Sequence, residues 1–147
     1  MTEILIRRET NVTPELLEAF QRLMPQLTNA KIPGFDDLKQ LLDSGSILIS
    51  AQSKEHGHLI IGSGTLALFR TPSGLHGHIE DVIVDGNFRG RGIGELLIKE
   101  LLRIARENGL TGLSLTCNPR RVEANQLYRK MGFTEWKTNT YWYDLKK

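Results

Sequence analysis

Apolar residues near the start of the chain predict a short strand followed by two helices. The strand covers Ile4 to Arg8. Thr13-Pro14-Glu15 is typical of a helix start, because it offers a hydroxyl N-cap and a proline at the first helical position. A second, shorter helix is predicted from Asp36, as an acidic N-cap, to Asp43, with Ser44-Gly45 as its end. Five apolar residues recur at helical spacing in the first helix: Leu16, Leu17, Phe20, Leu23 and Met24.

From Ile47 onward the pattern is typical of strands. Ile47–Ala51 and Leu59–Gly62, the latter continuing through Thr65–Phe69, are predicted to be neighbouring strands. The dipeptides His56-Gly57 and Ser73-Gly74 provide turn residues between them. His78–Val84 is mostly apolar and β-branched, but it carries two adjacent acids, Glu80 and Asp81. Since side chains alternate along a strand, the two acids are expected to point to opposite faces.

The rest of the chain predicts further helices and strands. A long helix is expected from about Gly92 to Asn108, followed by a strand at Leu113–Cys117 and a helix at Arg121–Lys130. Phe133–Trp136 and Tyr141–Leu145 are expected to form a terminal hairpin. Together the elements predict an α/β fold, with a mixed sheet and helices on both faces. The residues of the long helix that are expected to face the core are Ile93, Leu96, Leu97, Leu101, Ile104 and Ala105.

Composition limits the function classes. The chain has 147 residues, which predicts a single domain covering 1–147. A net charge of +2 favours neither nucleic acid nor an anionic membrane as a partner. Apolar runs are far shorter than the roughly 20 residues that span a bilayer, and the start of the chain lacks a signal-peptide pattern, so a cytoplasmic location is expected. One cysteine and four scattered histidines give no metal-ligand spacing, so no metal is expected.

The segment between the strand ending at Val84 and the long helix is rich in glycine and arginine. It reads Asp85-Gly86-Asn87-Phe88-Arg89-Gly90-Arg91-Gly92-Ile93-Gly94. Glycine lets the backbone approach a ligand closely, and a helix beginning here directs unpaired N–H groups toward the same space. The pattern therefore predicts an anion site. It is not a P-loop, which needs Lys-Ser/Thr after the last glycine, nor the dinucleotide G-x-G-x-x-G fingerprint.

Two separate motifs resemble the Gcn5-related N-acetyltransferase (GNAT) superfamily. Arg89-Gly90-Arg91-Gly92-Ile93-Gly94 resembles its Arg/Gln-x-x-Gly-x-Gly/Ala signature, and Asn118 to Phe133 resembles its Asn-x-x-x-x-x-Ala-Asn-x-Leu-Tyr-x-x-x-Gly-Phe block. The resemblance covers roughly residues 78–136. It implies the family's fold, in which a mostly antiparallel central sheet has a splayed strand pair that holds acetyl-CoA.

By this resemblance the main chain of one loop and one strand binds the cofactor. The residues implied for the CoA pyrophosphate are Arg89, Gly90, Arg91, Gly92, Ile93 and Gly94. Val82, Ile83 and Val84 lie where the family's fourth strand pairs with the pantetheine arm. Asn118 and Asn125 match positions whose amides contact the cofactor, although Asn118 also fits a helix cap.

Acetyl transfer also needs an acid and a base. Tyr128 matches the family's general acid, which protonates the departing CoA thiolate; packing against Phe133 is the alternative. An alkylamine is protonated at neutral pH, so a base is needed, and Glu80 is the preferred candidate over Asp81 and His78. Leu113-Ser114-Leu115-Thr116 offers no acid, whereas many relatives carry the base on that strand.

The resemblance implies an acetyl-CoA-dependent N-acetyltransferase that transfers acetyl directly to a primary amine of a small molecule or a protein. His78-Ile79-Glu80-Asp81-Val82 is similar to a segment of glucosamine-6-phosphate N-acetyltransferases, which makes that sugar phosphate a minority candidate. The alternative is a non-catalytic acyl-CoA-binding or regulatory module on the same fold. Relatives often form homodimers, so a dimer is also an expectation. Nucleic-acid binding through Arg89, Arg91, Arg120 and Arg121 is poorly supported because no aromatic platform accompanies them.

Overall fold

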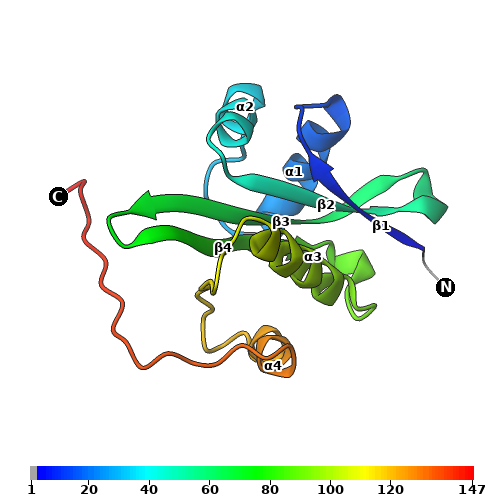
Figure 1. Ribbon diagram of the computed structural model, residues 1–147. Helices are drawn as coiled ribbons and strands as arrows, with labels where there is room; N and C mark the ends of the chain where they lie inside the picture. The colour runs from blue at the N-terminus through cyan, green and yellow to red at the C-terminus, as the bar shows by residue number, and fades with distance from the viewer. Residues whose placement is uncertain (1–2) are drawn as a thin grey trace. The chain divides into compact units, whose positions relative to one another are not determined.

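A computed structural model describes residues 3–147 of the chain (Figure 1). The described residues divide into two compact units, one ending at Thr116 and one covering Cys117–Lys147. The first, here called the sheet unit, holds a four-stranded sheet and three helices. The second, here called the C-terminal unit, holds one helix. Each is described by itself.

The sheet is antiparallel, with its strands in chain order. It comprises β1 (Ile4–Glu9), β2 (Ile47–Ser53), β3 (Leu59–Thr71) and β4 (Gly74–Val84). The four strands predicted before residue 85 are confirmed, and β4 extends back from His78 to the Ser73-Gly74 turn. β4 lies at one edge of this sheet, so its outer side is not paired with another of the four strands.

Helices α1 (Pro14–Leu27) and α2 (Phe35–Asp43) cover one face of the sheet. The Thr13 hydroxyl accepts a hydrogen bond from the Leu16 N–H, so the predicted N-cap of α1 is confirmed. The predicted N-cap of α2 is wrong. Gly34 is the N-cap, and its N–H donates to the Asp37 carboxylate at 2.9 Å, which leaves Asp36 in the first turn. The buried residues packed on this face are Leu16, Ala19, Phe20, Leu23, Leu38, Leu48, Ile60 and Ile83.

Helix α3 (Ile93–Glu107) covers the opposite face. Its Leu97 and Leu101 side chains lie 3.3 Å and 3.1 Å from where a Cβ would stand on Gly62 and Gly64 of β3. These two glycines therefore let α3 approach the sheet closely. The α/β prediction with helices on both faces is confirmed. Within α3, Leu96 is exposed and Ile98 is fully buried, so the prediction that Leu96 faces the core is wrong.

A β-bulge interrupts the pairing of β3 with β4. Thr65 lies opposite Glu80 and Ser63 lies opposite Ile83, so β4 has one extra residue between the two pairs. Asp81 lies in this bulge with φ at 51°, a left-handed conformation that is uncommon for a residue other than glycine. The extra residue changes which side chains share a face beyond it.

Three strands predicted near the end of the chain do not form. Leu113–Cys117 forms only a single parallel bridge, between Ser114 and His78. In the C-terminal unit, α4 (Val122–Lys130) confirms the predicted helix, but Phe133–Trp136 and Tyr141–Leu145 form no strands. An isolated two-stranded hairpin is marginal without a further strand or a helix to cover it. The large side chains of this segment are exposed: Trp136, Tyr141, Trp142, Tyr143 and Leu145.

Candidate functional site

The loop from β4 to α3 begins with a buried carboxylate. The Asp85 side chain accepts a hydrogen bond from the Asn87 N–H at 3.0 Å and so begins the short 3-10 helix Gly86–Phe88. Arg22 of α1 donates to the same carboxylate at 3.0 Å. Gln26, one turn further along α1, accepts from the Gly86 N–H at 2.8 Å. Helix α1 therefore fixes the start of the loop.

Arg22 also donates to Glu18 and to the Ile60 carbonyl, which places its guanidinium firmly. The hydrogen bond to Glu18 is the main reason that the pKa of Arg22 lies above its usual value, and it lowers the pKa of Glu18. Sequence reasoning missed the role of Arg22 and Gln26. Their spacing of four residues on the polar side of α1 is the signal that they reach the same place.

The glycines of the loop adopt conformations that other residues disfavour. Gly90 and Gly92 have φ of 79° and 77°, in the left-handed region. Gly92 is the N-cap of α3 and supplies no side-chain hydrogen bond to the first turn, where Ile93 and Gly94 lie. No heavy atom lies within 4 Å of where a Cβ would stand on Gly92. The space beside Gly92 is therefore open, and α3 begins without a side-chain cap, as an anion site at a helix N-terminus requires.

The two arginines of the loop contact the end of β4 and the Phe88 ring. Arg89 donates from Nε to the Val84 carbonyl at 3.1 Å. The guanidinium of Arg91 stands 5.1 Å from the centre of the Phe88 ring, which is a cation-π distance. His56, from the β2–β3 connection, packs edge-on against the same ring at 5.1 Å. Both positive charges are thereby placed beside the helix N-terminus that begins at Gly92.

β4 provides a free backbone edge next to this loop. Ser114 pairs with the early part of β4, since the Ile79 N–H donates to the Ser114 carbonyl at 2.9 Å and the Ser114 N–H donates to the Gly77 carbonyl at 3.2 Å. Among the described residues no strand continues this pairing along Val82, Ile83 and Val84. The edge of these three residues is where the family resemblance implies that the pantetheine arm binds.

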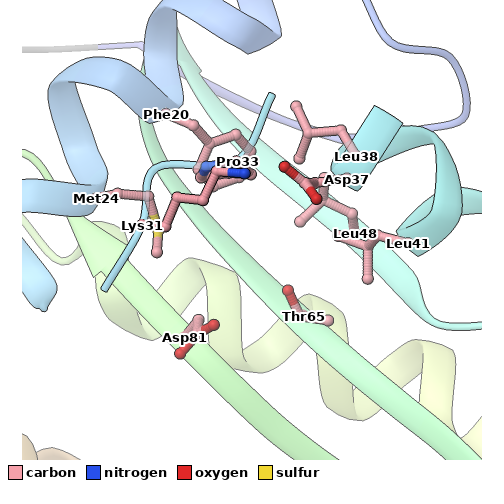
Figure 2. Close-up of a pocket in the computed structure, with 10 residues that line it drawn as sticks. All are labelled: Phe20, Met24, Lys31, Pro33, Asp37, Leu38, Leu41, Leu48, Thr65 and Asp81. Carbon is pink, nitrogen blue, oxygen red and sulfur yellow. The ribbon is translucent and has the colours of Figure 1, made fainter. Parts of the chain in front are cut away.

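A pocket of about 200 Å³ lies between the sheet and the connection from α1 to α2 (Figure 2). Its apolar lining comes from Phe20, Met24, Pro33, Leu38, Leu41 and Leu48, and its polar lining from Lys31, Asp37, Thr65 and Asp81. Figure 2 shows Thr65 and Asp81 on neighbouring strands at the floor, with Asp37 on α2 across from them. A pocket with an apolar wall and a few polar groups suits a small organic molecule.

The expectation that Glu80 and Asp81 point to opposite faces is wrong. Glu80 is paired directly with Thr65, and residues paired in this way share a face. Because Asp81 occupies the bulge, it also lies on that face and lines the pocket, whereas simple alternation would place it on the other side. Both carboxylates therefore lie on the pocket side of β4. No single-residue signal in the sequence marks the bulge.

Glu80 belongs to a chain of polar contacts. Its Oε1 lies 2.9 Å from Nε2 of His78, and Nδ1 of His78 lies 2.7 Å from the hydroxyl oxygen of Ser114. Sequence reasoning left Ser114 out, because it looked only for an acid on that segment.

The remaining predicted residues lie in the C-terminal unit. Tyr128 packs edge-on against Phe133 with ring centres 5.7 Å apart, and burial is the main cause that raises the pKa of its phenol. The Asn118 side chain accepts from the Arg120 N–H at 2.9 Å. The Asn125 amide donates to the backbone carbonyls of Asn118 and Arg121. These two asparagines therefore build the turn that leads into α4, and Asn118 caps this turn rather than the helix, whose N-cap is Arg121.

In residues 3–147, no helix has the length and apolar character needed to cross a membrane. Over the same range, no group of three or more His, Cys, Asp or Glu side chains is arranged to hold a metal ion.

Known proteins resemble this chain in sequence and in structure. The model of the "Acetyltransferase (GNAT) family" matches residues 13–133. A rice protein (Oryza sativa subsp. japonica), named "Probable glucosamine 6-phosphate N-acetyltransferase 2", is 36% identical over 115 residues, covering 76% of this chain and 68% of its own. An acetyltransferase structure from Trypanosoma brucei has a TM-score of 0.76 at 27% identity, covering 97% of this chain and all of its own. AAC(6')-Iy, solved in complex with a bisubstrate analogue of CoA, has the same fold, with a TM-score of 0.78 at 19% identity; 97% of this chain and 98% of that one are covered.

Proposed function

Because the chain belongs to the acetyltransferase (GNAT) family and is an N-acetyltransferase, we propose that it transfers acetyl directly from acetyl-CoA to the primary amine of a small molecule held in the pocket of α1, α2 and β4. The observation that carries this proposal is the site at the start of α3. There, two left-handed glycines and an N-terminus without a side-chain cap leave backbone donors open to an anion.

The CoA pyrophosphate would bind the main chain of Arg89, Gly90, Arg91, Gly92, Ile93 and Gly94. This is supported by the open space at Gly92 and by the positive charges of Arg89 and Arg91 beside it. The pantetheine arm would pair with the edge formed by Val82, Ile83 and Val84, as an added strand does.

Asn118 and Asn125 are proposed cofactor contacts from the family resemblance alone. Their hydrogen bonds within the C-terminal unit hold the turn before α4. A substitution at either position would therefore disturb this turn as well as any contact with the cofactor.

In the proposed reaction Glu80 is the base and Tyr128 is the acid. The ammonium of the acceptor gives a proton to the Glu80 carboxylate, and the freed lone pair forms the new C–N bond at the thioester carbonyl. The C–S bond then breaks, the CoA thiolate takes the phenolic proton of Tyr128, and the second proton of the new C–N nitrogen passes through solvent to the Tyr128 phenolate, which leaves the neutral amide and restores the phenol. Burial raises the pKa of Tyr128, so the phenol holds the proton that this step needs at neutral pH.

The acceptor is proposed to be an amino sugar phosphate or a small amine of similar size. The name of the rice relative supports the sugar phosphate, as does the His78-Ile79-Glu80-Asp81-Val82 segment. In the pocket, Lys31 provides a cation for a phosphate, and Thr65 and Asp81 provide groups for hydroxyls or an ammonium. A peptide amine and a non-catalytic acyl-CoA-binding role are the competing proposals.

A panel of acceptors tests the proposal. Purified protein is mixed with acetyl-CoA and with glucosamine 6-phosphate, glucosamine, polyamines, an aminoglycoside or peptides, and release of free thiol is followed. We expect saturable thiol release with glucosamine 6-phosphate above that with glucosamine. If the protein binds acetyl-CoA but releases no thiol with any of these amines, the result would favour the non-catalytic acyl-CoA-binding module.

A cytoplasmic location stays a prediction from the sequence, and we further propose a homodimer. Its support is the exposed aromatic segment of the C-terminal unit, where Trp136, Tyr141, Trp142 and Tyr143 are all more than three-quarters exposed. Light scattering should give twice the chain mass, and a monomer at micromolar concentration would contradict it.

A further inference from the structure

His78 lies between two polar side chains that are far from each other in sequence. Its Nδ1 is 2.7 Å from the Ser114 hydroxyl, and its Nε2 is 2.9 Å from the Glu80 carboxylate. The His78 side chain is 23% exposed and the Glu80 side chain 51%. The ring is therefore largely shielded, while the carboxylate that it contacts still reaches the solvent side.

Backbone hydrogen bonds fix the position of Ser114. The Ile79 N–H donates to the Ser114 carbonyl, and the Ser114 N–H donates to the Gly77 carbonyl. These two bonds form the parallel bridge that sets Ser114 opposite His78. The position of the Ser114 hydroxyl is thus set by hydrogen bonds to β4, which hold it within reach of the His78 imidazole.

Hydrogen-bonding capacity assigns the tautomer of His78. An ionised carboxylate only accepts hydrogen bonds, so Nε2 must carry the hydrogen that points to Glu80. In a neutral imidazole Nδ1 is then an acceptor, and the Ser114 hydroxyl donates to it. Both ring nitrogens are satisfied, and the ring has one preferred orientation.

Glu80 lies beside the floor of the pocket. It is paired with Thr65, which lines the pocket, and it precedes Asp81, which also lines it. A carboxylate in this place can take a proton from an amine only if one of its oxygens stays directed at the acceptor. The hydrogen bond from His78 occupies Oε1, so the second oxygen is the one available for the acceptor.

We propose that His78 is a positioning residue for acetyl transfer: fixed by Ser114, it holds the Glu80 carboxylate in the orientation that accepts the acceptor's proton. This rests on the proposed function, in which Glu80 is the base. In this proposal Glu80 is the proton acceptor, and the part of His78 is the Nε2–H hydrogen bond that holds Oε1. The proton moves from the ammonium to Glu80 and leaves to solvent after the C–N bond has formed.

Two substitutions of His78 distinguish the contact made by Nε2 from the contact made by Nδ1. The amide nitrogen of a glutamine reaches approximately as far as Nε2, whereas that of an asparagine reaches only as far as Nδ1. We expect His78→Gln to keep kcat within about threefold of wild type, and His78→Asn to lower kcat about tenfold, or about 1.4 kcal/mol, with KM for both substrates unchanged. His76→Asn is the matched control, because His76 lies on the same strand but contacts Thr71 and Ser73 at the hairpin.

A double-substitution cycle tests whether His78 acts through Glu80. In the Glu80→Gln background, His78→Asn should cause no further loss of kcat. Equal losses in His78→Gln and His78→Asn, or losses that add fully with Glu80→Gln, would overturn the proposal and give His78 a purely structural role. If His78→Asn does not fold, Ser114→Ala takes its place, with an expected fall in kcat of about threefold and no change in KM.

Kinetics of the single variants distinguish the role of Glu80 from the role of His78. Unchanged kcat in Glu80→Gln would overturn the assignment of Glu80 as the base, and the role of His78 with it. A large loss in Glu80→Gln together with wild-type kcat in His78→Asn would overturn the role of His78 alone.

Discussion

Gly92 and Gly109 offer a matched pair for testing the anion site. Gly92 begins α3 with φ of 77°, and Gly109 follows its other end with φ of 80°. Neither position has a heavy atom within 4 Å of an added Cβ. Alanine at either position therefore meets the same backbone strain of about 1–2 kcal/mol and no steric clash. Each substitution should lower the midpoint of thermal unfolding by roughly 3–6 °C.

Only Gly92→Ala should also weaken acetyl-CoA binding. The added methyl group would occupy the space before the first amides of α3, and relaxation of the left-handed backbone would redirect the N–H groups of Ile93 and Gly94. Loss of one hydrogen bond to a charged group is worth about 1.5–3 kcal/mol, so Kd should rise about 10-fold to 100-fold. Calorimetric titration with acetyl-CoA measures Kd for both variants. Equal Kd values in Gly92→Ala and Gly109→Ala would refute the reasoning.

Substitutions of Tyr128 and Asp85 test the catalytic acid and the start of the loop. Tyr128→Phe should lower kcat about 100-fold and leave Kd for acetyl-CoA unchanged, and full turnover would remove Tyr128 from the reaction. Burial raises the pKa of Tyr128 above its ordinary value of 10.0, so the protonated phenol persists to high pH. We therefore expect kcat to stay level up to about pH 10. A fall in kcat with a midpoint below pH 9 would contradict this. Asp85→Ala removes a buried partner of Arg22 and of the Asn87 N–H. The free energy of unfolding, measured in urea, should fall by about 2–3 kcal/mol, which is less than for a fully buried ion pair because Arg22 is partly exposed. A change below about 0.5 kcal/mol would contradict this.

Much of the sheet unit could be predicted from local patterns. The caps at Thr13 and Gly92 and the change of period at Ile47 all mark element boundaries in the sequence itself. The loop glycines were predictable for the same reason, since their role depends on backbone conformation and not on a distant partner.

Features that depend on distant partners could not be predicted. The bulge at Asp81 arises from the pairing of β4 with β3, and one extra residue was enough to bring Asp81 to the same face as Glu80. Likewise, Ser114 gains its contact with His78 from a bridge between segments 36 residues apart. The hairpin predicted after Phe133 failed because alternation alone gives no strand without a partner edge.

The central claim is that the main chain at the start of α3 binds the pyrophosphate of acetyl-CoA. A crystal structure of the chain with CoA tests it most directly. The account predicts phosphate oxygens within hydrogen-bonding distance of the backbone N–H groups of Gly92, Ile93 or Gly94, with the pantetheine arm along Val82–Val84. CoA bound elsewhere, with water at these amides, would contradict it.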